Sequence, residues 1–281
     1  VTFIARSERT KALNESGLEM DCKAFHETIA VKASTELSIL SDADLVLLSV
    51  KSLDTERTLA QVQSILPSKA VILSLQNGVA NIEVASKVVA NPIYAAVVYV
   101  AAGMIGQRTM KHHGRGELLI GNPSQANGRD DEYLQGICAL FEGAGVPCSI
   151  APQIKRDMWL KFLVNCSFNA ISGIGQIPYG EMVKSPGIVK LIEEITKEFL
   201  VIAALEDVNI TMSEAVAINA SIATTMVTQV SSTAQDLARG KMTEIDFLNG
   251  YIVELGKRYG IATPYNESVH ALVKMLESQI K

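Results

Sequence analysis

The hydrophobic pattern of this 281-residue chain changes about halfway along it. In the first half, short apolar runs such as DLVLLSV at 44–50 and AVILSL at 70–75 alternate with stretches of helical periodicity. A continuous apolar run of this length is typical of a parallel strand buried on both faces. From about residue 155 onward only helical patterns occur. The chain is therefore predicted to form an α/β domain with a doubly wound parallel sheet, followed by an all-helical domain.

The expected elements follow from the same pattern. Strands are predicted at 1–5, 44–50, 70–75, 93–101, 117–120 and 147–150, with helices at 10–17, 54–66, 81–89 and 131–143. The later helices are predicted at 156–172, 187–204, 213–239, 243–259 and 267–281. The two patterns meet at Ala151 and Pro152, which places an α/β domain at 1–152 and a helical domain at 153–281. A cleft between two domains is a favoured place for a ligand.

Composition excludes several classes of protein. The net charge is −5 and Lys and Arg form no cluster, which argues against nucleic-acid binding. No apolar run reaches the roughly 18 residues that a membrane span needs, and no basic secretory signal is present. The four cysteines form no CxxC pattern and have no histidine at ligand spacing, so we expect reduced thiols in a cytoplasmic protein and no metal site.

An apolar helix predicted at 159–173, WLKFLVNCSFNAISG, carries one polar stripe. Lys161, Asn165 and Asn169 are four residues apart and therefore share one helical face. Burying an ammonium group without a partner costs several kcal/mol or shifts its pKa. Two interpretations stay open: the three side chains hydrogen-bond to neighbouring helices, or they form one wall of an active site.

Polar side chains also follow three of the predicted strands. Arg6 follows the first strand, Lys51 follows the run at 44–50, and Asn77 follows the run at 70–75. Ligands of doubly wound folds bind beyond the carboxyl ends of the strands. The first strand of this chain matches the second strand of a dinucleotide-binding domain, and an arginine after that strand suits a ribose 2′-phosphate. A single polar residue after a strand is usually an ordinary loop residue, and it is the three strand ends together at one edge that favour a ligand site.

One expected motif is missing from the chain. The fingerprint G-x-G-x-x-G lies on the first strand–helix turn of dinucleotide-binding domains, where the glycines let the backbone approach the pyrophosphate. Here the first glycine is Gly17, and the chain opens on what matches the second strand. We expect the first strand and helix to lie upstream of Val1 in the natural protein.

A second polar constellation occurs in SSTAQDLARGKMTEIDFLNG at 231–250. Ser232 and Glu244 are its candidate site residues, although a helix-end hydroxyl and a first-turn carboxylate also have ordinary structural roles. Together with the stripe at 159–173, the VK and LQNG strand ends, HHGRGELLIG at 112–121 and GIATPYN at 260–266, this segment resembles the ketopantoate reductase (2-dehydropantoate 2-reductase) family. The resemblance extends over the whole chain.

The resemblance implies NADPH-dependent reduction of the ketone of 2-dehydropantoate to pantoate, a step toward coenzyme A. It also implies a Rossmann domain and a helical domain like that of 6-phosphogluconate dehydrogenase. Lys161 would be the general acid. Asn165, Asn169 and Ser232 would bind the substrate, and Glu244 would orient the substrate or the lysine and touch the cofactor.

The remaining positions match residues that contact NADPH in this family. Arg6 would bind the 2′-phosphate, and Lys51 would contact the cofactor near its nicotinamide half. Asn77 would contact both cofactor and substrate, and Ala102 would offer its backbone to the carboxamide. The segment AAGMIGQRTM at 101–110 departs from the glycine- and proline-rich turn of many relatives, and we expect this difference to alter substrate choice.

Two alternatives remain beside this activity. The chain is a related NADPH-dependent reductase of another branched 2-oxo acid, or it is a non-catalytic nucleotide-binding protein if the glycine loop is truly absent. The apolar C-terminal helices are also compatible with a homodimer formed through the helical domain.

Overall fold

The structure, a computed structural model, describes residues 1–125 and 131–280. By its internal contacts the chain divides into two compact units. The first unit contains Val1–Val50, Asp54–Leu75 and Ile82–Ile154. The second contains Lys155–Lys281 together with two short segments from the first half of the chain, Lys51–Leu53 and Gln76–Asn81.

The described residues of the first unit form a mixed, parallel-rich sheet in the order β3-β2-β8-β7-β6-β5, with β9 beside β8. Its strands are β2 (Leu18–Cys22), β3 (His26–Ile29), β5 (Leu45–Leu48), β6 (Val71–Ser74), β7 (Ile93–Ile105), β8 (Thr109–Gly121) and β9 (Cys148–Ile150). The pairs β5–β6, β6–β7, β2–β8 and β8–β9 are parallel, and β7–β8 and β2–β3 are antiparallel. A second, two-stranded sheet pairs β1 (Thr2–Ile4) with β4 (Lys32–Ser34) in parallel.

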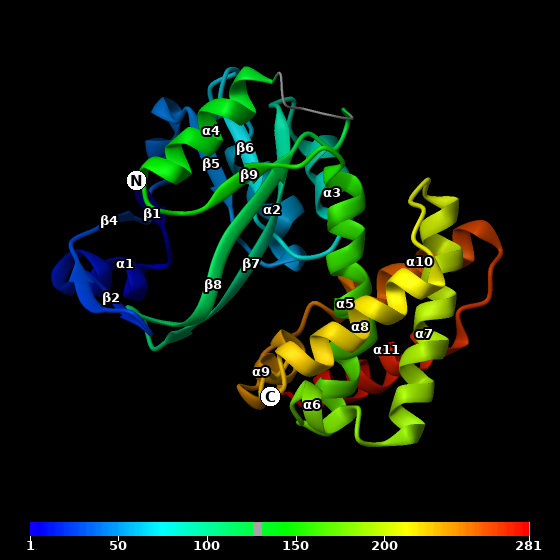
Figure 1. The fold of residues 1–281 in the computed structure, drawn as a ribbon. Helices are drawn as coiled ribbons and strands as arrows, with labels where there is room; N and C mark the ends of the chain where they lie inside the picture. The colour runs from blue at the N-terminus through cyan, green and yellow to red at the C-terminus, as the bar shows by residue number, and fades with distance from the viewer. Residues whose placement is uncertain (126–130, 281) are drawn as a thin grey trace. The chain divides into compact units, whose positions relative to one another are not determined.

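Strand β6 explains why a continuous apolar run forms a central strand. Val71 and Leu73 face a cluster that includes α4 (Glu132–Gly143). Ile72 points the other way, toward α2 (Thr55–Val62) and α3 (Asn81–Val88). Successive strand residues point to opposite faces, so a strand covered on both faces needs apolar side chains throughout. Figure 1 shows α4 on one side of this sheet and α2 and α3 on the other.

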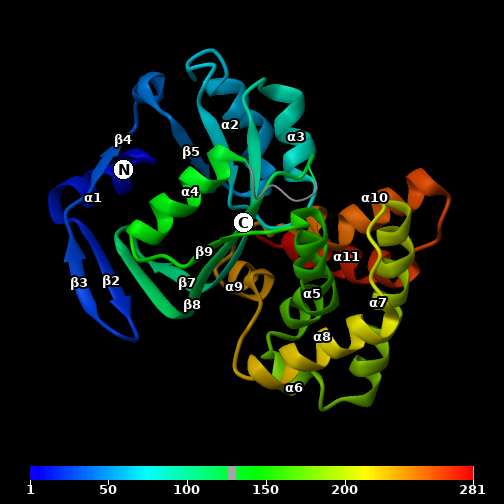
Figure 2. The ribbon, with the colours of Figure 1, turned by 45° about the horizontal axis from the view of Figure 1, so that its top comes forward.

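The second unit is helical and is built around one long helix, α5 (Ile154–Gly175). Its other helices are α6 (Tyr179–Met182), α7 (Pro186–Leu205), α8 (Met212–Thr225), α9 (Ser232–Ala238), α10 (Asn249–Tyr259) and α11 (Pro264–Glu277). Phe162 of α5 packs edge-to-face on Phe199 of α7, with ring centroids 5.3 Å apart. Figures 1 and 2 show α9 on one side of α5 and α7 on the other.

The structure corrects several predicted boundaries. Strands β2, β3 and β4 were not predicted. β3 is exposed throughout and β4 is only three residues long, whereas β2 is half-buried and alternates apolar with acidic residues, a strand signal that was missed. Strands β7 and β8 are 13 residues each, longer than predicted. The predicted helix at 213–239 is two helices, because the backbone carbonyls of Val227 and Gln229 accept hydrogen bonds from α6 instead of from their own helix. The predicted helix at 243–259 begins only at Asn249.

None of the helices in the described ranges combines the length and apolar character that a membrane span requires. The four cysteines are free thiols, and Cys148 and Cys166 are buried.

A glycine permits the close contact between α5 and α9. A Cβ on Gly173 would lie 2.8 Å from Cγ2 of Thr233, the second residue of α9. We therefore expect Gly173→Ala to lower the free energy of unfolding by about 1–3 kcal/mol through overpacking. Denaturant unfolding measures this change.

Gly136→Ala is the matched control, because Gly136 lies on an exposed face of helix α4 and a Cβ there meets no atom within 4 Å. This control should be neutral or stabilise the protein by up to about 1 kcal/mol. A Gly173→Ala protein as stable as the control would show that α9 does not depend on this contact.

Candidate active site

The predicted polar stripe lies on helix α5. Lys161 and Asn165 are half-buried, and Asn169, two turns after Lys161, is only 3% exposed. The positions between them are largely buried in the hydrophobic core of the second unit. The stripe is therefore a polar line along a helix that is otherwise surrounded by apolar side chains.

The end of the stripe meets α9. The Asn169 side-chain nitrogen donates to Ser232 Oγ at 3.5 Å, so two residues that lie 63 positions apart in the chain are brought together. Ser231 caps α9 by accepting from the Ala234 N–H at 3.0 Å, and its hydroxyl donates to the Asn169 backbone carbonyl at 3.1 Å. The cap thus anchors the start of α9 to α5, and Ser232 remains exposed.

A third residue in this cluster was missed by the sequence analysis. The Tyr179 hydroxyl, on α6, donates to Asn169 Oδ1 at 3.2 Å. Tyr179 is 6% exposed, and burial raises the pKa of its hydroxyl well above the usual range. The only available signal was a tyrosine that follows a proline just after the long helix, which is too common a pattern to indicate a site.

Glu244 is held by residues that follow the strands of the first half of the chain. Its Oε1 accepts from the Ser52 backbone N–H and from the Ser52 hydroxyl, both at 2.8 Å. The Asn81 amide in turn donates to Ser52 Oγ at 3.0 Å and to the Asn77 carbonyl at 2.7 Å. All four residues belong to the second unit, so the carboxylate, the serine and the Asn77 backbone form one network.

Ser52 and Asn81 were not predicted as site residues. Ser52 directly follows the predicted Lys51, and its burial was not visible in the sequence. Asn81 stands at the start of α3, and its side chain donates to Ser52 and Asn77.

The segment that carries Glu244 is also anchored from its other side. Glu277 of α11, 4% exposed, accepts from the Thr243 backbone N–H and hydroxyl, both at 2.7 Å. The Thr243 hydroxyl oxygen also accepts from the Ile245 N–H at 3.1 Å. The backbone on both sides of Glu244 is therefore fixed by hydrogen bonds.

Lys51 is part of an ion pair in this structure. Its ammonium nitrogen lies 2.6 Å from Asp236 Oδ2 and donates to the Met242 carbonyl at 2.9 Å. Both partners belong to the same unit as Lys51. The lysine is thereby held between α9 and the segment that leads to Glu244.

Two of the predicted residues, Arg6 and Ala102, belong to the first unit. Arg6 lies two residues after the end of β1, stands at the N-cap position of α1 (Ser7–Ser16) and is exposed. Within the described part of the chain it takes part in none of the ion pairs, so its guanidinium is available to an anion. The N–H groups of a first helical turn favour negative charge as well, so this position fits a phosphate group. Ala102 lies on β7 opposite His112 and is exposed.

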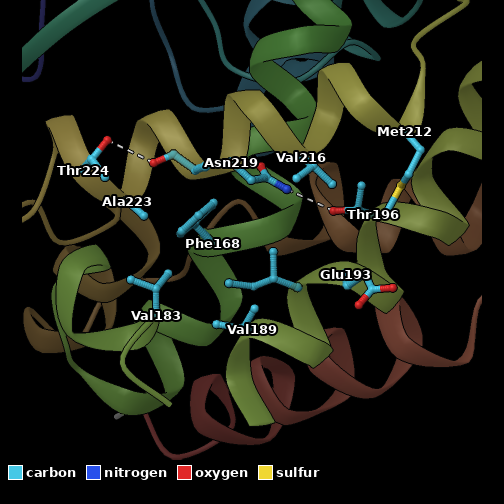
Figure 3. A pocket seen from close by; sticks show the side chains of 12 residues that line it. Phe168, Val183, Val189, Glu193, Thr196, Met212, Val216, Asn219, Ala223 and Thr224 are labelled. Carbon is cyan, nitrogen blue, oxygen red and sulfur yellow. Dashed lines mark hydrogen bonds between the residues drawn. The ribbon is translucent and has the colours of Figure 1, made fainter. Parts of the chain in front are cut away.

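A cavity of about 480 Å³ lies elsewhere in the second unit, between α5, α7 and α8 (Figure 3). Its walls are mostly apolar, and its polar lining residues are Glu193, Thr196, Asn219 and Thr224. The buried Asn219 amide donates to Thr196 Oγ1 at 3.1 Å and to Ser167 Oγ at 3.4 Å. Phe168 lines it from α5. The predicted site residues are not among its described lining residues, so the polar cluster at Asn169 and this cavity are separate features.

Comparisons with known proteins cover both units. The family model for ketopantoate reductase PanE/ApbA matches residues 1–125, and the model for the C-terminal part of the same family matches residues 153–277. The 2-dehydropantoate 2-reductase of Halobacterium salinarum is 30% identical over 275 residues, which cover 97% of this chain and 89% of the relative. That of Pyrococcus horikoshii is 30% identical over 278 residues, covering 99% and 90%.

Solved structures agree with these matches. The PanE/ApbA family ketopantoate reductase of Ralstonia eutropha is 40% identical with a TM-score of 0.92, covering 99% of this chain and 91% of that one. A ternary structure of D-mandelate dehydrogenase with NADH and anilino(oxo)acetate is 26% identical with a TM-score of 0.91, covering 100% and 91%. The resemblance inferred from the sequence motifs is thus confirmed along the chain: it belongs to the ketopantoate reductase family and is an oxidoreductase.

Proposed function

We propose that the protein reduces 2-dehydropantoate to pantoate with NADPH, a step toward coenzyme A. The names of the curated relatives support this substrate. The observation that carries the proposal is the polar line on α5, where Lys161 and Asn165 precede the Asn169–Ser232 pair. A cation next to a set of neutral hydrogen-bond donors suits a substrate that has both a ketone and a carboxylate.

Lys161 is the proposed general acid. Reduction of a ketone builds negative charge on its oxygen, and an ammonium group beside that oxygen stabilises the charge and then supplies the proton. When bound, the dinucleotide supplies the hydride.

Asn165, Asn169 and Ser232 are proposed to bind the substrate, with Asn77 at the cofactor side. Amide and hydroxyl groups donate to a carboxylate without adding a charge that competes with the lysine. Glu244 is proposed to orient the substrate or the lysine and to touch the cofactor. Because Oε1 is engaged by Ser52, its other oxygen, Oε2, is the one that would accept from a ligand.

For the cofactor, Arg6 is proposed to bind the 2′-phosphate, with Lys51, Asn77, Ala102 and Glu244 along the remainder of the dinucleotide. The exposed guanidinium at the first turn of α1 supports a phosphorylated ribose. To contact the cofactor, the Lys51 ammonium group would have to give up part of its ion pair with Asp236.

A second candidate activity is the reduction of another bulky or branched 2-oxo acid. The similarity to a D-mandelate dehydrogenase in complex with anilino(oxo)acetate favours it, because the same fold there accommodates an aromatic 2-oxo acid analogue. The domain limits at 1–152 and 153–281, a homodimer through the helical unit and a cytoplasmic location stay predictions.

One assay separates the two activities. NADPH oxidation by the full-length protein is followed with 2-dehydropantoate and, in parallel, with a panel of aliphatic and aromatic 2-oxo acids. We expect the highest kcat/KM with 2-dehydropantoate. A higher value with another 2-oxo acid would select the second candidate, and no turnover with any of them would reject both.

Removing the proposed acid tests the mechanism. We expect Lys161→Ala to lower kcat by about 10²–10⁴, the range that general acid catalysis contributes, with little change in fold. Lys155→Ala is the matched control, because Lys155 lies on the same helix, is exposed and donates to the Glu206 carbonyl. Steady-state kinetics and circular dichroism check both variants, and an unchanged kcat in Lys161→Ala would remove this residue from the acid role.

Removing the proposed phosphate ligand tests cofactor choice. Arg6→Ala should weaken NADPH binding by roughly 10- to 100-fold, as expected for the loss of a hydrogen bond between charged groups, and should leave NADH binding nearly unchanged. Fluorescence titration of both dinucleotides gives the Kd values, with Lys11→Ala, an exposed cation of the same helix, as control. Equal weakening of NADPH and NADH would contradict the assignment.

A further inference from the structure

Three side chains of the second unit form a directional chain of hydrogen bonds from the core to the surface. The Tyr179 hydroxyl donates to Asn169 Oδ1 at 3.2 Å, and the Asn169 side-chain nitrogen donates to Ser232 Oγ at 3.5 Å. Tyr179 and Asn169 are 6% and 3% exposed, whereas Ser232 is exposed. The open end of the chain is therefore the serine hydroxyl.

The direction of this chain decides what the open end offers to a ligand. An asparagine amide has an acceptor and a donor end of nearly equal size, and a rotation of 180° exchanges them. Because Tyr179 donates to the oxygen, the nitrogen of Asn169 faces Ser232. Ser232 Oγ accepts that bond, so its own hydrogen is left to donate outward. Both groups then present N–H or O–H to a ligand.

Tyr179 is well suited to hold this orientation. Its backbone N–H donates to the Gln229 carbonyl at 2.9 Å, and the next residue, Gly180, donates to the Val227 carbonyl at 3.0 Å. Its ring packs against Phe168 with centroids 5.2 Å apart. The hydroxyl is thus placed by contacts that do not involve Asn169. Burial raises its pKa, so it stays a donor throughout the neutral and mildly alkaline range.

We propose that Tyr179 is a positioning residue of the substrate site, which holds the Asn169 amide with its nitrogen outward and makes Asn169 and Ser232 a donor-only subsite for the substrate carboxylate. This role rests on the proposed function. Without the tyrosine hydroxyl the Asn169 amide is free to rotate, and its carbonyl oxygen would then face and repel the carboxylate. A donor-only subsite also disfavours a carboxamide, which brings N–H groups of its own.

The variant Tyr179→Phe removes the hydroxyl and keeps the ring. We expect KM for the 2-oxo acid to rise about 5- to 15-fold, which is the effect expected from the loss of about one hydrogen bond to the substrate. We expect kcat to change less than twofold. The ratio of kcat/KM for the 2-oxo acid to that for its 2-oxo amide should fall by a similar factor. Both readouts are independent of the fraction of folded enzyme, so they hold even if the variant is less stable.

A double-mutant cycle separates positioning from packing. In an Asn169→Ala background, Tyr179→Phe should change KM less than twofold, because the tyrosine acts through the amide that is no longer there. Tyr94→Phe is the matched control: the Tyr94 hydroxyl, of a residue 5% exposed in the first unit, donates to Asp131 Oδ2 at 2.9 Å. It should cost stability and leave KM and the acid-to-amide ratio unchanged.

The outcomes distinguish this role from the proposed function. If the wild-type protein turns over no 2-oxo acid, the proposed function fails and the Tyr179 role fails with it. If the wild type is active but Tyr179→Phe has an unchanged KM and an unchanged acid-to-amide ratio, the Tyr179 role alone is overturned. An equal effect of Tyr179→Phe with and without Asn169 would also overturn it.

Discussion

The second unit depends on one constraint: the polar groups of a buried helix must find hydrogen-bond partners. An unpaired amide or hydroxyl in an apolar interior costs on the order of 1–3 kcal/mol, so each polar position on α5 determines which segment packs there. Asn169 illustrates this, because its side chain engages α6 and α9 and its backbone carbonyl accepts from the α9 cap. The hydrogen bonds that offset the cost of burying these polar groups therefore also orient them.

The Glu244 network extends this constraint to segments from the first half of the chain. Lys51–Leu53 and Gln76–Asn81 follow strands of the first unit, yet their contacts assign them to the second. Ser52 gives both its backbone N–H and its hydroxyl to Glu244, and Asn81 joins Ser52 to the Asn77 backbone. A carboxylate that would be costly to desolvate is thereby stabilised by neutral donors, while Lys51 is engaged by Asp236.

Much of the fold was predictable from local pattern, and the errors have physical causes. The apolar run at 71–74 forms a central strand, and the run at 45–48 forms the strand beside it at the end of the described sheet. The stripe at Lys161, Asn165 and Asn169 lies on one long helix. The predicted helix at 213–239 is broken because backbone N–H groups of α6 donate to the carbonyls of Val227 and Gln229. Local helix propensity does not reveal such a long-range contact. Of the candidate site, Asn169 and Ser232 were each named from the family motifs, but their contact was not predicted, and Tyr179, Ser52 and Asn81 were not named at all.

The sequence by itself determined the class of each half, the helical face that carries the lysine and asparagines, and the family. These properties depend on residue type and spacing, which act over one or two turns of helix or along one strand. Only the tertiary structure decided that Asn169 is held between Tyr179 and Ser232, and that Glu244 is bonded to Ser52. Hydrogen bonds are short and directional, so their partners depend on where distant segments pack, and that is set by the whole chain.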